Sequence, residues 1–392
     1  MPDEHPRVAV IGAGIGGLTV AGALTARGFP VQVYEQASAF SRIGAGIQQS
    51  ANAVKVLREL GLEPTLRARG FVPASFVHRA AGTGEVTNDI PLGARAEGRY
   101  GAPYLALHRG DLHDVLLAAV PAGAIHRGRR LVGLEQPGDG VELAFADGSR
   151  ARADVVVGAD GVHSLVRETL FGPHELRFSG KAGYRATLPA SALGGERLDD
   201  NTKWWGPDRH LIVYYLTAAR DEVYAMGTVP EPDFDLESWS AKGDVDVFCA
   251  AFADFHPTVR TLLGSVPLVH KWALADRDPL PRWSDGDVVV MGDAAHPMMP
   301  HMGQGAAMAV EDAAVLVRCL EAAAGDWSGA LRRFEETRRA RTSEMQAISA
   351  GNSFARTGKD AVDFVYGYDA WTTPLAGAPA PTTTSTPGGN DR

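Results

Sequence analysis

A turn of glycines near the start of the chain has the residue types and spacing that bind a dinucleotide. Residues 12–17 read GAGIGG and follow a short apolar stretch. In this pattern Gly12 permits a tight turn, Gly14 lets the backbone approach a pyrophosphate, and Gly17 allows a helix to pack closely on a strand. The helix that follows would offer unpaired N–H groups and a partial positive charge to phosphate oxygens.

The elements around this turn are those of a βαβ unit. The apolar stretch 8–11 predicts a buried strand, and a second strand is expected at 31–34. This second strand ends at Glu35, whose carboxylate could accept hydrogen bonds from the two ribose hydroxyls. A glycine-rich turn without a ligand is the alternative, but strand, turn, helix and acid together favour a nucleotide site.

Two later segments repeat the sequence of an apolar strand followed by a turn. Residues 154–167 predict a strand, a turn that contains Asp160, and a helix. Residues 287–316 predict a strand, the turn with Asp293, and a Pro/Gly-rich loop that leads into a helix near Gly303. We expect both strands to join the first βαβ unit in one parallel sheet.

The stretch between these segments changes character. Residues 203–209 are expected to form a turn flanked by aromatics, and 210–216 and 221–227 are expected to pair as antiparallel strands. Further on, residues 331–348 are rich in arginine and glutamate with apolar positions at helical spacing. They predict a long exposed helix.

These patterns predict an α/β protein. A Rossmann-like nucleotide-binding domain with a parallel sheet would be joined to a substrate domain with a mostly antiparallel β-sheet and to a C-terminal helix. The expected ranges are 1–180 and 281–370 for the nucleotide-binding domain with the C-terminal helices, 181–280 for the substrate domain, and 374–392 for a disordered tail.

Composition excludes several classes of function. The chain has 392 residues and a formal net charge of −9, which argues against nucleic acid as a partner. No apolar run is long enough to cross a membrane, and the first residues lack the apolar core of a secretion signal. Cys249 and Cys319 have no metal-ligand or redox spacing, so we expect buried thiols, no metal site and a cytoplasmic location.

Candidate substrate-binding residues lie on the predicted strand 210–216. His210, Ile212 and Tyr214 share one face, so a histidine and a phenol would lie on it with an apolar side chain between them. This arrangement suits a small, flat, polar aromatic ring. A local bulge would bring Tyr215 to that face instead, and a purely structural role for the histidine is the other alternative.

Three further features have both a binding and a structural interpretation. Arg109 begins an amphipathic helix, where it could contact a phosphate or form only a surface ion pair. Asp293 ends a buried strand, where ligands of open α/β sheets gather, or it could cap a turn. The loop 300–305 contains His301 and precedes a helix whose N-terminus could stabilise negative charge on a bound ring, or it could be a plain entry into that helix.

The three separated motifs together resemble the single-component FAD-dependent aromatic monooxygenases, the group of para-hydroxybenzoate and salicylate hydroxylases. The motifs are GAGIGG with Glu35, GADGVHS, and MGDAAHPMMP, and the resemblance extends from about Val8 to Tyr368. Within this family the chain is most similar to the 6-hydroxynicotinate 3-monooxygenase subgroup. The strings KWWGPDRHLIVYY, HPMMPHMGQGAAMAVEDAA and VYGYD carry that likeness.

The resemblance implies a set of site residues. His210, Tyr214 and His301 would bind the substrate and deprotonate its ring hydroxyl. FAD contacts would come from Gly12, Gly14, Gly16, Gly17, Glu35, Gln36, Gln48, Arg109, Leu131, Asp160, Asp293 and Gly303. The chain departs from the subgroup at Gln48, where a histidine is expected, and at Asn201 and Ala295, where cysteines are expected.

The implied activity is hydroxylation of a small hydroxy-aromatic or hydroxypyridine ring, one that carries a carboxylate. NADH or NADPH and O2 would be the co-substrates, with a flavin hydroperoxide as intermediate and carbon dioxide loss as a variant. A flavin-dependent oxidase or dehydrogenase on the same fold is the alternative, and a nucleotide-binding regulatory protein without turnover is another. The sequence indicates no particular oligomeric state.

Overall fold

The glycine turn follows an inner strand of a six-stranded sheet. All strands of this sheet are parallel except one strand at its side. The computed structural model describes residues 5–40, 45–234, 241–351 and 359–377, so the expected tail lies outside the described residues from position 378 onward. The strand order is β18 (Ser284–Asp285), β19 (Val288–Val290), β11 (Val155–Gly158), β1 (Val8–Ile11), β2 (Val31–Glu35) and β7 (Ile125–Arg127). Of the two strands predicted from the later segments, β11 pairs in parallel with β1 and β19 pairs in parallel with β11, so both join one sheet with the βαβ unit, as expected.

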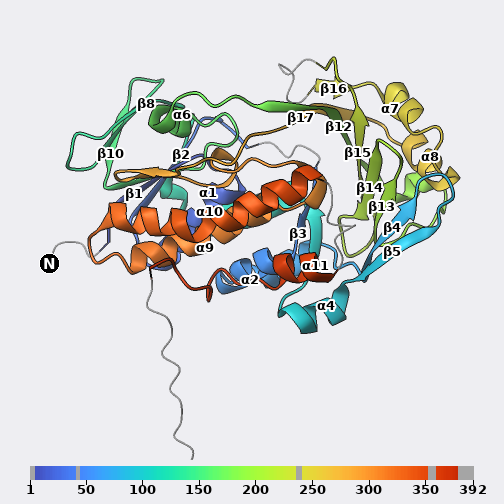
Figure 1. The fold of residues 1–392 in the computed structure, drawn as a ribbon, viewed down its shortest axis with the longest axis horizontal. Helices are drawn as coiled ribbons and strands as arrows, with labels where there is room; N and C mark the ends of the chain where they lie inside the picture. The colour runs from blue at the N-terminus through green and yellow to red at the C-terminus, as the bar shows by residue number, and fades with distance from the viewer. Residues whose placement is uncertain (1–4, 41–44, 235–240, 352–358, 378–392) are drawn as a thin grey trace, which may run out of the picture.

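Helices pack on this sheet and on one another. Helix α9 (Gly305–Glu321) contacts α1 (Ile15–Ala26), α2 (Ala51–Glu59) and α10 (Trp327–Gly351). In Figure 1 a small antiparallel sheet lies at the opposite end of the molecule from the large antiparallel sheet described next. Its strands are β8 (Leu131–Glu135), β9 (Val141–Phe145) and β10 (Arg150–Ala153).

The second large unit is an eight-stranded, mostly antiparallel sheet. Its order is β16 (Ala241–Gly243), β17 (Val269–Asp276), β12 (Arg177–Pro189), β15 (Glu222–Pro230), β14 (His210–Tyr215), β13 (Asn201–Trp205), β4 (Ser75–Ala80) and β5 (Val86–Pro91). Helices α7 (Val245–Ala251) and α8 (Pro257–Gly264) lie beside this sheet (Figure 1), and apolar side chains such as Phe248 and Leu262 pack against its strands. The predicted fold class is confirmed.

Two details of this sheet differ from the sequence analysis. Residues 203–205 were expected in a turn but belong to β13, which pairs with β14 in antiparallel register, so the turn is shorter. Strands β4 and β5 join the sheet from outside the range 181–280. They do so because β4 pairs in parallel with β13, a long-range pairing that local patterns do not reveal.

The expectation that residues 331–348 form an exposed helix is wrong for one face of α10. Arg338 is 0% exposed, and Arg341 is also buried. Arg338 pairs with Glu311 and Asp312, and Arg341 pairs with Glu311, all across the contact between α9 and α10. Charged residues are rarely buried unless paired, and here both partners come from a distant helix, so the sequence pattern alone suggested a solvated face.

The remaining elements complete the scaffold. They are β3 (Gly46–Gln49), β6 (Leu105–His108), α3 (Glu63–Arg69), α4 (Gly93–Tyr100), α5 (Arg109–Ala118), α6 (Leu165–Phe171) and α11 (Lys359–Tyr366). Cys319 is buried as predicted, whereas Cys249 on α7 is only partly buried, because one side of that short helix faces solvent.

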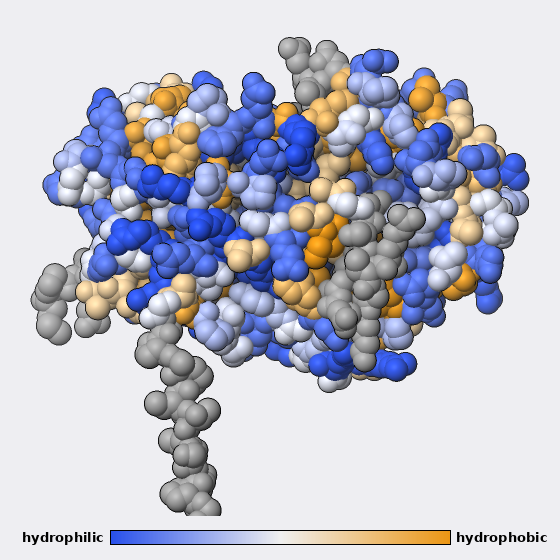
Figure 2. Space-filling view, viewed as in Figure 1, coloured by the Kyte–Doolittle hydropathy of each residue, from blue (hydrophilic) through white to orange (hydrophobic). Residues whose placement is uncertain are grey.

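Figure 2 shows one face of the molecule as mostly hydrophilic, with small scattered apolar patches. Within the described residues, no helix is both long and apolar enough to cross a membrane.

Candidate active site

The glycine turn is shaped by close backbone contacts. Gly12 has φ +102°, and a Cβ built on it would lie 2.4 Å from the Ala159 carbonyl oxygen. A Cβ on Gly17 would lie 2.0 Å from the Gly12 carbonyl oxygen, which confirms the predicted close packing of helix on strand. A Cβ on Gly14 would meet nothing within 4 Å, so space is open at the N-terminus of α1. The turn is therefore closely packed at Gly12 and Gly17 and has open space at Gly14.

Glu35 is bound to this turn. One carboxylate oxygen accepts a hydrogen bond from the Ala13 backbone N–H at 2.8 Å, and the other accepts from the Ala37 N–H at 2.7 Å. The end of β2 is thereby fixed against the glycine turn. The ribose contact predicted for Glu35 stays a prediction.

Three loops that are distant in the chain meet at this edge of the sheet. The glycine turn lies against the Asp160 loop, because a Cβ on Gly12 would lie 3.1 Å from the Asp160 Cα. The Asp160 loop meets the Asp293 turn through Arg167, which donates hydrogen bonds to the carbonyls of Val162 and Ala294 at 3.1 Å and 3.3 Å. The predicted convergence of the loops is therefore present.

The turn with Asp293 is held by buried charges. The Gly292 N–H donates to Asp312 Oδ2 at 3.0 Å, and the same oxygen lies 2.6 Å from His296 Nε2. Arg338 Nε donates to the other oxygen of Asp312 at 2.7 Å. Helices α9 and α10 thus position the turn, and the Asp293 side chain remains accessible.

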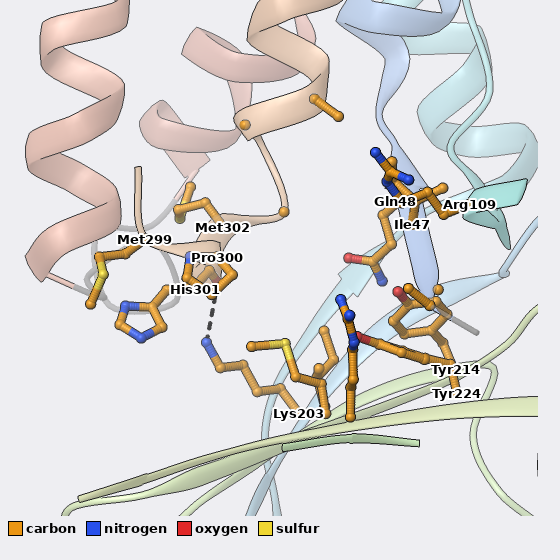
Figure 3. A pocket seen from close by; sticks show the side chains of 18 of the residues that line it. Ile47, Gln48, Arg109, Lys203, Tyr214, Tyr224, Met299, Pro300, His301 and Met302 are labelled. Atoms are coloured by element: carbon orange, nitrogen blue, oxygen red, sulfur yellow. Dashed lines mark hydrogen bonds between the residues drawn. The ribbon is translucent and has the colours of Figure 1, made fainter. Parts of the chain in front are cut away.

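A pocket of about 280 Å³ lies between the eight-stranded sheet and the loop after β19. Figure 3 shows side chains of the sheet facing those of this loop across the cavity. Seven residues predicted from the sequence line it together: Gln48, Arg109, His210, Tyr214, Asp293, His301 and Gly303.

Strand β14 presents alternate side chains to this pocket. His210, Ile212 and Tyr214 line it, as the period of two predicts. Tyr215 packs on the other face, in the apolar core with Phe71 and Val223, so the bulged alternative is wrong.

Imidazole groups gather at one end of the pocket. The rings of His210 and His301 lie 5.2 Å apart, edge to face. His301 Nδ1 donates to the Ser349 carbonyl at 3.0 Å, which leaves Nε2 as an acceptor, and the described residues provide no partner for that atom. Burial, with a contribution from the charge of Lys203, lowers the pKa of His301 to about 4 and that of His210 well below its usual value. Both rings are neutral at pH 7, so they are hydrogen-bond acceptors and only weak bases.

Phenol groups gather at the other end. The rings of Tyr214 and Tyr224 lie 5.1 Å apart. Burial raises the pKa of Tyr214 well above its usual value and that of Tyr224 to about 12, so both remain neutral O–H donors. The Nε2 of Gln48 is also buried there without a hydrogen-bond partner among the described residues.

Comparison with known proteins places this geometry in a family. The model of the FAD binding domain family matches residues 6–348. The 6-hydroxynicotinate 3-monooxygenase of Bordetella bronchiseptica is 44% identical over 373 residues, which cover 94% of this chain and 97% of that protein. The 3-amino-4-hydroxybenzoate 2-monooxygenase of Streptomyces cremeus is 41% identical, with 88% and 86% covered. The chain belongs to the FAD-dependent aromatic monooxygenases.

A solved structure of the same fold supports the cofactor. The Klebsiella pneumoniae protein HpxO, in complex with FAD and uric acid, superposes with a TM-score of 0.80 at 27% identity, and 92% of each chain is covered. The chain is therefore an FAD-dependent monooxygenase, and the comparisons give no support to an oxidase or dehydrogenase.

The residues present fit FAD. Arg109 and Asp293 both line the pocket, and their side chains are exposed to it. Groups that contact a ligand are expected to be exposed in this way before the ligand binds. The Oδ2 of Asp160 accepts from the Val166 N–H at 3.1 Å, while its Oδ1 is buried without a partner among the described residues. Together with the open space at Gly14, these groups provide a cradle from the α1 N-terminus to the pocket.

Other predicted contacts lie away from the pocket. Gly16 faces α9, where a Cβ would lie 3.1 Å from the Ala309 Cβ, so it allows the two helices to approach. Gln36 is exposed after β2, and Leu131 is a buried core residue at the start of β8. The predicted FAD contacts of these residues stay predictions.

The predicted site residues did not include several polar side chains that line the pocket. Among them are His78 on β4, Lys203 on β13, Arg185 on β12 and Tyr224 on β15. The pairing of 201–205 with 210–214 across a Gly-Pro-Asp turn was the signal that could have placed Lys203 beside Ile212. The described residues contain no cluster of three or more histidine, cysteine or acidic side chains that could hold a metal ion.

Proposed function

We propose that this monooxygenase hydroxylates a small aromatic or pyridine ring that carries both a hydroxyl and a carboxylate, with NADH or NADPH and O2 as co-substrates. The observation that carries the proposal is the division of the pocket into an acceptor end, with His210 and His301, and a donor end, with Tyr214 and Tyr224. The names of the relatives agree, since they hydroxylate a hydroxynicotinate and an aminohydroxybenzoate.

The pocket is suited to a flat ring. Its volume of about 280 Å³ lies at the small end of the range for ligand pockets, and Ile212, Met226 and Met299 supply apolar walls between the polar ends. Such a pocket excludes water from the reacting atoms and fixes the ring in one plane.

FAD, once bound and reduced by the nicotinamide, supplies the activation of O2. Residues of the pocket then orient the substrate ring and increase its reactivity. At the acceptor end, where His301 Nε2 lies without a partner among the described residues, the ring hydroxyl is oriented so that its proton can be withdrawn, which increases the electron density of the ring. The α9 N-terminus, which follows Gly303, favours negative charge in its vicinity. Loss of carbon dioxide would follow where the carboxylate occupies the carbon that is hydroxylated.

A substrate screen tests this proposal. The purified holoenzyme would be mixed with NADH or NADPH and a panel that includes 6-hydroxynicotinate, 3-hydroxybenzoate and salicylate, under 18O2. Coupled nicotinamide oxidation with one 18O atom in the product is the expected result. Substrate oxidation without nicotinamide, or nicotinamide consumption that no ring stimulates, would refute it.

A further inference from the structure

A row of four side chains crosses the floor of the pocket. In the register of the eight-stranded sheet, Lys203 lies opposite Ile212, Ile212 lies opposite Met226, and Met226 lies opposite Arg185. All four line the pocket. Since neighbouring strands are about 4.8 Å apart, the two cationic residues stand roughly 14 Å apart at the backbone, with two apolar side chains between them.

The two ends of this row have different surroundings. Lys203 is 4% exposed, its Nζ donates to the His301 carbonyl at 3.3 Å, and it lies 4.1 Å over the Trp205 ring. Arg185 lies 5.0 Å over the Trp272 ring, and its charge acts on Tyr224. Lys203 thus belongs to the acceptor end of the pocket, and Arg185 belongs to the donor end.

We propose that this row fixes the direction of the bound ring: Lys203 accepts the proton of the ring hydroxyl and pairs with the resulting oxyanion, while Arg185 binds the ring carboxylate. This inference rests on the proposed function. The O–H bond of the hydroxyl breaks, its electron pair stays on oxygen, and the proton forms an N–H bond on the Lys203 amine. An ammonium and an oxyanion result, with no other reactant.

Side-chain chemistry supports this direction and not the reverse. The planar guanidinium of Arg185 keeps its charge and matches both oxygens of a carboxylate, and the neutral phenols of Tyr214 and Tyr224 can donate to the same oxygens. A lysine can lose its proton when buried, and burial lowers the pKa of Lys203 to about 7. The nearby histidines are much weaker proton acceptors, since burial lowers the pKa of His301 to about 4 and the pKa of His210 well below its usual value.

The charged and titratable groups around Lys203 come from three elements. They are His78 on β4, His210 on β14 and His301 in the loop after β19, and the Lys203 charge lowers the pKa of each. All three are neutral at pH 7, so Lys203 is the member of this group whose protonation changes near neutrality. The acid limb of kcat/KM is therefore expected near pH 7.

The test separates the two ends with two variants and three ligands. Lys203→Met and Arg185→Met would be compared with Lys181→Met, which removes a cation from the neighbouring cavity beside His210. Binding of benzoate, 3-hydroxybenzoate and phenol to the oxidised holoenzyme would be followed by the visible spectrum of FAD, without turnover. Arg185→Met should weaken benzoate and 3-hydroxybenzoate at least tenfold and leave phenol unchanged. Lys203→Met should leave benzoate unchanged and abolish the ionisation of bound 3-hydroxybenzoate at pH 8.

Kinetics give the second readout. Lys203→Met should lower kcat/KM at pH 7 by about 10²- to 10³-fold and move the acid limb from about 7 toward the pKa of the free hydroxyl, about 10 for a phenol. Lys203→Arg should show the same loss of the limb, because arginine cannot accept the proton. An acid limb that stays near pH 7 in both variants, or weaker benzoate binding in Lys203→Met than in Arg185→Met, would overturn the inference. If wild-type enzyme binds none of the three ligands and hydroxylates no ring, the proposed function fails instead.

Discussion

Replacement of Arg338 by methionine should destabilise the protein and loosen the Asp293 turn. The Arg338 side chain is 0% exposed, with its Nε 2.7 Å from Asp312 and its Nη1 2.7 Å from Glu311. Its removal leaves two buried acids with fewer partners, since Asp312 then keeps its contact with His296 and Glu311 keeps its ion pair with Arg341. Removal of one member of a buried ionic group costs about 3–5 kcal/mol of the free energy of unfolding.

The pH dependence of this loss follows from Asp312. Burial alone would raise its pKa, but the charges of His296 and Arg338 outweigh burial and lower the pKa to about 2. The carboxyl of Asp312 has a pKa of about 3.9 in the unfolded chain. The ionised Asp312 therefore stabilises the folded state fully above that pH, and its contribution disappears as the pH falls through about 2. In Arg338→Met the folded-state pKa rises, so the difference in stability between variant and wild type should narrow as the pH falls from 7 toward 4.

Urea unfolding of the apoprotein, followed by tryptophan fluorescence at pH 7 and pH 4.5, measures both effects. Arg332→Met is the matched control, because Arg332 is an exposed arginine on the same helix. FAD affinity should also fall in Arg338→Met, since Asp312 accepts the Gly292 N–H next to Asp293. The reasoning is refuted if Arg338→Met and Arg332→Met unfold within about 1 kcal/mol of each other and bind FAD equally well.

Five further variants test separate parts of the site. Gly17→Ala should lower apoprotein stability by about 1–3 kcal/mol and also lower FAD affinity, since its Cβ would lie 2.0 Å from a backbone oxygen. Gly14→Ala should lower FAD affinity alone, because its Cβ would meet nothing within 4 Å. Equal unfolding midpoints for the two apoproteins would contradict this. Tyr214→Phe should raise KM for a carboxylated ring about tenfold with little change in kcat, and an unchanged KM would remove its donor role. His301→Leu, which removes the acceptor nitrogen, should lower kcat/KM while FAD titration stays normal, and full activity would exclude His301 as a required acceptor. Gln48→His should change which ring couples nicotinamide oxidation to hydroxylation, and an unchanged substrate profile would exclude this position from specificity.

The nucleotide end of the site could be predicted from the sequence because its determinants are local. The glycine turn with Glu35 and the two later strand–turn segments each lie within one continuous stretch of sequence, and the structure places them together. The alternation of His210 and Tyr214 along one strand was equally local, since it needed only the period of two.

The residues that the sequence did not reveal depend on pairings between distant segments. Arg185 and Lys203 become neighbours of Met226 and Ile212 only through the register of three antiparallel strand pairs. Arg338 looked solvated because its acidic partners lie on another helix. Local charge patterns predict where a charge can be solvated, but not where a distant segment will neutralise it.

The FAD end and the substrate end of the site therefore depend on different features of the protein. At the FAD end, close glycine contacts fix the backbone of the turn, so the N–H groups predicted to meet the cofactor are in place before it binds. At the substrate end, the sheet provides one permanent charge at Arg185 and one lysine whose pKa of about 7 lets it exchange a proton near neutrality. A permanent charge suits a group that stays ionised throughout, and a titrating amine suits a hydroxyl that must become ionised only after the pocket has enclosed it. The orientation of the bound ring therefore depends on the chemical difference between Lys203 and Arg185, and not on the presence of two basic side chains.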